Sequence, residues 1–111
     1  MSRPAKFEEV LATYKRHGWA LARVLARPET LAELGGGASV GGVAAVESSV
    51  DAMWFRRASQ GGREAWELRL VEGTPYALFE LFEPDEAEED REDVRREMEA
   101  RLVEHAGGGR A

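Results

Sequence analysis

The first helical pattern lies at residues 4–17, where apolar side chains recur on one side of a helix. Four of them, spaced i, i+3, i+4 and i+7, share that face: Phe7, Val10, Leu11 and Tyr14. Gly18 follows, and glycine commonly ends a helix by adopting a left-handed conformation. The sequence therefore predicts an N-terminal amphipathic helix over 4–17.

A second helical pattern covers residues 85–105, directly after Pro84. Most of its positions are charged, and its narrow apolar stripe consists of Val94, Met98 and Leu102. The glycines that follow disfavour helix. We therefore expect a C-terminal helix over 85–105 and a flexible Gly-rich tail over 107–111.

Residues 50–83 carry the alternating pattern of strands, interrupted by two Gly-containing turns. In the middle strand, apolar residues alternate with Glu67 and Arg69, so one side faces a core. The last strand is apolar on both sides except at Glu80, which is typical of a strand covered on both faces. The predicted antiparallel meander has strands at 52–59, 64–71 and 76–82.

The segment between the first helix and the meander is harder to assign. Residues 19–26 fit either a strand or a continued helical stripe, and we favour a strand because the stop signal at 15–18 is strong. Residues 28–34 predict a short helix with proline at its first position. Residues 35–49 are mostly Gly, Ala, Ser and Val, which indicates a flexible connection with a short strand at 43–46.

Together these elements predict an α+β fold in one domain, residues 1–106. The simplest arrangement is a four-stranded antiparallel sheet, a β-meander plus one strand, packed by the N-terminal and the C-terminal helix on one face. A chain of 111 residues is long enough for one core, and 43% of its residues are hydrophobic.

Large apolar residues occupy both faces of the predicted strands. Strict alternation places Phe55, Phe79 and Leu81 on the face opposite Trp54 and Trp66. Either the sheet is covered on both faces, with residues 28–49 on the second, or it packs against a partner or a second copy. An exposed apolar patch usually marks an interface, so Phe55, Phe79 and Leu81 are candidate interaction residues.

The net charge of −6 is concentrated near the C-terminus. Residues 83–105 hold eleven acidic side chains and four arginines, a net charge of −7. Such a surface repels nucleic acid and anionic lipid, so we expect neither as a partner. The acidic residues at the start of the second helix fit a solvated helix start or a docking surface for a protein: Glu88, Glu89, Asp90 and Asp93.

The chain contains no cysteine, which excludes disulfides, thiolate catalysis, zinc ribbons and iron–sulfur clusters. No apolar run approaches the ~20 residues of a membrane span. The N-terminus has no apolar signal region, so we expect a cytoplasmic protein without a membrane partner.

Candidate chemistry is sparse. Ser39 lies in a G-x-S-x-G string, but a nucleophile elbow needs a strand before it and a helix after it, and a Gly-rich stretch matches that string easily. We therefore expect no enzyme, metal or cofactor. An alternative is an anion site, in which backbone amides of the 35–42 loop act with Ser39, Arg56, Arg57 and Arg63.

The sequence thus favours a small non-enzymatic, bacterial-type protein that acts through protein–protein interaction, as an adaptor or chaperone, with a homodimer as one form. In size, acidity and mixed α/β content it resembles the bacterial secretion chaperones. The alternative function is a regulatory domain that binds a small ligand or anion through the 35–42 loop.

Overall fold

The computed structural model describes residues 2–108, and its elements follow the expected order with one extra strand. Residues 20–26 form a strand, as favoured from the stop signal before them. In chain order the elements are α1 (Arg3–Arg16), β1 (Ala20–Ala26), α2 (Pro28–Leu34), β2 (Ser39–Val40), β3 (Val43–Glu47), β4 (Ala52–Ala58), a 3-10 turn (Gln60–Gly62), β5 (Glu64–Leu70), β6 (Tyr76–Phe82) and α3 (Glu88–Gly108).

Helix α1 begins and ends at signals that the sequence carries. The side chain of Ser2 caps it by accepting a hydrogen bond from the backbone N–H of Ala5 at 3.2 Å. Beyond the other end, Gly18 has a φ of +85°, which glycine adopts without strain. The predicted helix over 4–17 is therefore confirmed to within one residue at each end.

The sheet is larger than the expected four-stranded antiparallel one, and it is mixed. Its strand order is β2-β3-β1-β4-β5-β6. Strands β1, β4, β5 and β6 pair in antiparallel fashion and correspond to the predicted meander plus one strand. The prediction is wrong for the other end of the sheet, where β3 pairs with β1 in parallel and β2 pairs with β3.

The short strand expected at 43–46 is present as β3, but it forms a hairpin with β2 where the rest of 35–49 was expected to be a flexible connection. Gly41 and Gly42 join β2 to β3 with φ values of +55° and +82°, as a two-residue loop of this twist requires. A Cβ atom on Gly41 would also lie 2.8 Å from the side chain of Leu11 in α1. Helix α2 provides the crossover that the parallel pairing of β1 and β3 needs.

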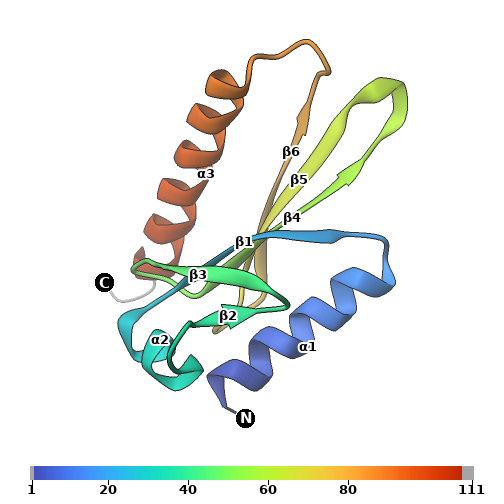
Figure 1. The fold of residues 1–111 in the computed structure, drawn as a ribbon. Coiled ribbons are helices and arrows are strands. Elements are labelled where there is room, and N and C mark those ends of the chain that lie inside the picture. Colours follow the sequence, from blue (N-terminus) through green and yellow to red (C-terminus); the bar gives the residue numbers. More distant parts are fainter. Residues whose placement is uncertain (1, 109–111) are drawn as a thin grey trace.

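The helices cover opposite faces of the sheet, which corrects the expectation that both lie on one face (Figure 1). Helices α1 and α2 pack against β1, β2 and β3, and α3 packs against β5 and β6 on the other side. We call the two sides the α1 face, which carries Phe55, and the α3 face, which carries Trp54. The first four residues of β4 are apolar on both faces of the strand and buried, so both faces need a cover.

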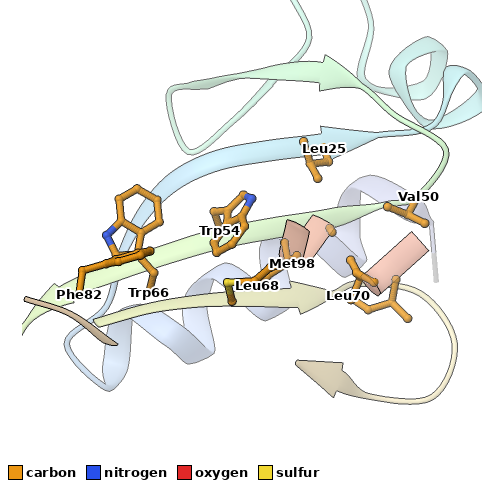
Figure 2. Close-up of a cluster of buried hydrophobic side chains, with 10 residues drawn as sticks. Leu25, Val50, Trp54, Trp66, Leu68, Leu70, Phe82 and Met98 are labelled. Carbon is orange, nitrogen blue, oxygen red and sulfur yellow. The ribbon is translucent and has the colours of Figure 1, made fainter. Parts of the chain in front are cut away.

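Each face has its own core. Under α1 and α2 the buried residues are Phe7, Val10, Leu11, Tyr14, Val24, Val40, Met53, Phe55 and Val71. Under α3 they are Leu25, Val50, Ala52, Trp54, Trp66, Leu68, Leu70, Phe82, Met98 and Leu102, most of which are labelled in Figure 2. The predicted alternation of Phe55 against Trp54 and Trp66 is confirmed.

Helix α3 begins at Glu88, three residues later than expected, and continues through Gly108. The predicted flexible tail over 107–111 is therefore wrong for Gly107 and Gly108, which are helical, while 109–111 lie outside the described residues. Among the helices of residues 2–108, none combines the length and apolar content that crossing a membrane requires.

The inner face of α3 is built around a charged side chain. Arg95 is only 1% exposed, and its guanidinium lies 4.4 Å from the centre of the Trp66 ring. It forms ion pairs with Glu88 and, at 3.0 Å, with Glu92. Glu92 also accepts hydrogen bonds at 2.6 and 3.2 Å from Arg23 of β1, and these are the main reason that the pKa of the Glu92 carboxyl is lowered.

We predict that Arg95→Ala lowers the free energy of unfolding by about 3 kcal/mol, because it leaves a cavity against Trp66 and removes the partner of two carboxylates. Arg96→Ala is the matched control, since Arg96 is exposed and, within residues 2–108, pairs with Asp93 alone among the carboxylates, and its cost should stay within about 0.5 kcal/mol. Urea unfolding followed by tryptophan fluorescence measures both. Equal losses would contradict a central role for Arg95.

Candidate functional site

Strand β6 is an edge of the sheet. It is last in the strand order and pairs only with β5, so within residues 2–108 the outer row of its backbone N–H and C=O groups has no strand partner. Natural edge strands are commonly protected by proline, by charged side chains or by a bulge. Between Tyr76 and Phe82 proline and bulges are absent, the pairing with β5 is continuous over seven residues, and the one charged side chain, Glu80, lies on the α3 face. β6 is therefore able to accept a further strand.

One face of β6 is also open. Ala77, Phe79 and Leu81 point to the α1 face, and Phe79 is 57% exposed there. The register places Phe55, Glu67 and Phe79 side by side across β4, β5 and β6. Helix α1 covers Phe55 on β4 and leaves Phe79 on β6 uncovered. The exposed apolar surface therefore begins at β6.

Tyr14 marks the border of that cover. Its ring stacks on Phe55 with centroids 4.0 Å apart, and its hydroxyl donates a hydrogen bond to the carboxylate of Glu67 on β5. Burial of the ring, followed by this hydrogen bond, raises the pKa of Tyr14 to about 12. Through Tyr14, α1 contacts β4 and β5 in the middle of the sheet but not β6.

The other face of β6 is partly covered by α3. The guanidinium of Arg91 lies 5.6 Å from the ring centre of Phe82, at the end of the strand. At its beginning, the ring of Tyr76 stacks on His105 with centroids 3.6 Å apart. Helix α3 thus runs antiparallel to β6 along the whole strand.

The apolar residues predicted to form an interaction surface do not stay together. Phe79 is exposed and Leu81 is half-buried beside it on β6. Phe55 is fully buried under α1, so its proposed place on the surface is corrected. The sequence pattern assigns all three to one face but does not show how far α1 extends over it.

The predicted acidic residues lie at the start of α3, on the opposite face from Phe79. All four are exposed: Glu88, Glu89, Asp90 and Asp93. Glu88 pairs with Arg95, and Asp93 with Arg96 at 3.1 Å. The acidic group and the open face of β6 are therefore separate surfaces.

The residues of the anion-site alternative are not brought together. Ser39 lies on β2 and Arg56 and Arg57 on β4, with two strands and about 14 Å between them. Arg57 donates a hydrogen bond to the backbone O of His17 at 2.9 Å, and its guanidinium lies 4.8 Å from the Trp19 ring centre. Arg63 pairs with Glu83 at 2.9 Å. Each of the last two arginines thus has a structural partner of its own.

A cleft of about 1130 Å³ opens between the last turns of α3 and the loops that precede β4 and β6. Buried Asp51 lines it and accepts hydrogen bonds from the backbone N–H of Arg27 and the hydroxyl of Thr30, both at 2.8 Å. The Arg27 guanidinium bridges Asp51 and Glu72. Sequence reasoning missed this group, because its contacts join residues 21 to 45 positions apart and follow no periodicity.

The side chains that line the cleft connect three parts of the fold, and most of their polar groups already have partners. Both oxygens of the Asp51 carboxylate accept hydrogen bonds, one from Arg27 after β1 and one from Thr30 in α2. In the wall of the cleft, Tyr76 and His105 stack on each other. Within residues 2–108, no three histidine or carboxylate side chains cluster closely enough to hold a metal ion.

Compared with known proteins, the chain matches no protein-family model, no curated protein sequence and no solved structure.

We predict that Tyr14 ionises near pH 12, about two units above the ordinary value of 10.0. Because the raised pKa belongs to the folded state, the stabilisation is fully present below pH 10 and is lost as the pH rises toward 12. Between those values the wild type should lose on the order of 2 kcal/mol relative to Tyr14→Phe. The difference in tyrosinate absorbance between the two proteins isolates Tyr14, and ionisation at its ordinary pKa would contradict the buried contact with Glu67.

For the cleft, we predict that Asp51→Ala costs about 3 kcal/mol of unfolding free energy, because the Arg27 N–H and the Thr30 hydroxyl lose a buried charged acceptor. Glu104→Ala, at an exposed position in the same cleft, should change stability by less than about 0.5 kcal/mol. Thermal and urea unfolding measure both. A loss as small for Asp51→Ala as for the control would show that Asp51 does not anchor α2.

Proposed function

We propose that this chain is a non-enzymatic protein-interaction domain, of adaptor or chaperone-like kind, that acts in the cytoplasm. The observation that carries the proposal is β6, an unpaired edge strand with a large exposed aromatic residue at its centre. The partner adds an extended strand along β6. Backbone hydrogen bonds provide affinity in this mode of recognition, and side-chain contacts on alternate residues provide specificity.

The open face of β6 defines what the added strand should carry. Phe79, with Ala77 and Leu81 on either side, offers apolar contacts to every second residue of a partner strand. Burying the exposed part of Phe79 contributes roughly 1–2 kcal/mol. The preferred partner segment is therefore extended and apolar at alternate positions.

The anion-binding alternative has less support. It needs Ser39 to act with Arg56, Arg57 or Arg63, and the sheet keeps Ser39 two strands away from β4. Arg57 and Arg63 are also engaged by His17 and Glu83. We therefore retain the protein-interaction function.

The test replaces Phe79 with the photo-crosslinking amino acid benzoylphenylalanine in the cells that make the protein. We expect irradiation to give a covalent adduct with another polypeptide, because the partner strand lies against this side chain. Mass spectrometry identifies the adduct, and both a different protein and a second copy support the function.

The matched control places the same amino acid at Val46, which is similarly exposed (59%) but lies on β3 and on the α3 face. Benzoylphenylalanine at position 46 should give no adduct, or a set of adducts that differs from the set at position 79. Adducts absent at position 79, or the same at both positions, would refute an interaction through β6.

A further inference from the structure

We infer that the strand added to β6 is a basic segment of another protein, with lysine or arginine at the positions that alternate with its apolar residues. This inference rests on the proposed function and names the chemistry of its partner. An added strand presents every second side chain to the α1 face and the others to the α3 face. The first set meets Phe79, so the second set meets the charges that α3 and β6 carry on the other face.

The contacts of α3 show which of its sides lies beyond β6. Around the helix, Glu92 pairs with an arginine of β1, Arg95 lies over a ring of β5, and His105 stacks on a ring of β6. In the same direction follow Val94 and Arg101, and then a row of carboxylates spaced i, i+7 and i+14. We call this row the edge row, and it consists of Asp90, Glu97 and Glu104.

The edge row matches the length of the strand beside it. Seven positions of a helix rise about 10.5 Å, so the three carboxylates span about 21 Å. The seven residues of β6 span about 20 Å. Because α3 runs antiparallel to β6, Asp90 lies level with the end of the strand, Glu97 with its middle and Glu104 with its beginning. A strand added along β6 therefore passes the whole row.

The surface beside the β6 edge is negative and open to a cation. All three carboxylates of the edge row are exposed, and within residues 2–108 none of them has an ion-pair partner. Glu80 adds a fourth carboxylate on the α3 face of β6. On the same side α3 carries Arg101 and His105, and His105 is stacked on Tyr76. The four carboxylates outnumber these two groups even when His105 is charged.

Lysine and arginine fit this place because their aliphatic stems lie on apolar surface while their charged ends reach further. Half-buried Leu78 and Val94 provide that surface between β6 and the edge row. A second copy of this chain fits poorly, since its β6 would bring Glu80 toward the same carboxylates. Charge complementarity therefore selects a basic strand of another protein.

Synthetic peptides of seven residues test the inference by fluorescence anisotropy. KVKVKVK has valine on one side and lysine on the other, EVEVEVE has glutamate in place of lysine, and KKVVVKK has the composition of the first peptide without its alternation. We expect KVKVKVK to bind more tightly than either control by about tenfold or more. Its binding should weaken as NaCl rises from about 50 to about 500 mM. Equal binding of KVKVKVK and either control, or no binding of KVKVKVK at millimolar concentration, would overturn the inference.

Charge reversal on α3 tests whether the edge row is the side that receives the lysines. The variant reverses every charge of the row: Asp90→Lys, Glu97→Lys and Glu104→Lys. It should bind KVKVKVK about tenfold more weakly, because three exposed ion pairs contribute a few-fold each, and it should bind EVEVEVE more tightly than the wild type. The gain for EVEVEVE shows that the variant is folded.

The matched control makes the same change in net charge at exposed positions of α1 and β3, far from β6: Glu8→Lys, Glu9→Lys and Glu47→Lys. Its binding of KVKVKVK should fall by less than about threefold, since distant exposed charges are screened by salt. If both triple variants lose the same affinity, the attraction belongs to the whole protein and the edge row is not the site.

Photo-crosslinking at position 79 separates this inference from the proposed function. Adducts whose cross-linked segment carries lysine or arginine at alternate positions support both. Adducts with a segment that has no such residues, or with a second copy of this chain, leave the interaction function standing and overturn the basic partner. The lack of any adduct at position 79 overturns both.

Discussion

The arrangement of the whole molecule depends on burying the guanidinium of Arg95. A helix as charged as α3 has little apolar surface with which to hold a sheet, and its inner face uses polar and cation–π contacts instead. These contacts reach successive strands: Arg23 with Glu92 on β1, Trp54 with Glu99 on β4, Trp66 with Arg95 on β5 and Phe82 with Arg91 on β6. Each requires its strand partner on the same face, so α3 is fixed to that face and α1 takes the other.

The helices are too few to cover six strands, since the α3 face has α3 alone and the α1 face has α1 and the short α2. Five spacings of about 4.8 Å make a sheet roughly 24 Å wide, whereas one helix covers about 10 Å. Each face is therefore left partly open, at opposite ends of the sheet: Phe79 is exposed on the α1 face and Val46 on the α3 face. Within residues 2–108, only at Phe79 does an open face coincide with a seven-residue sheet edge that has no strand partner on its outer side, which is why β6 is the proposed interaction site.

The candidate site was partly predictable. Alternation along the strands places Phe79 and Leu81 on one face, and Phe79 is indeed exposed. The same alternation includes Phe55, which α1 buries, because a period of two residues reports the face and not the length of the helix that covers it. The arginines were predicted to act with the 35–42 loop in an anion site, but the sheet separates Ser39 from β4, and Arg57 and Arg63 each have a partner of their own.

By itself the sequence determined the local elements: the period of the apolar residues, the glycine after α1 and the turn glycines define both long helices and four of the strands, because these signals act between near neighbours. Only the tertiary structure decided that residues 35–49 pair with β1, that the helices lie on opposite faces and that β6 remains an unpaired edge. Those outcomes depend on contacts between distant residues, such as Arg23 with Glu92 and Arg27 with Asp51, whose partners no periodicity reveals.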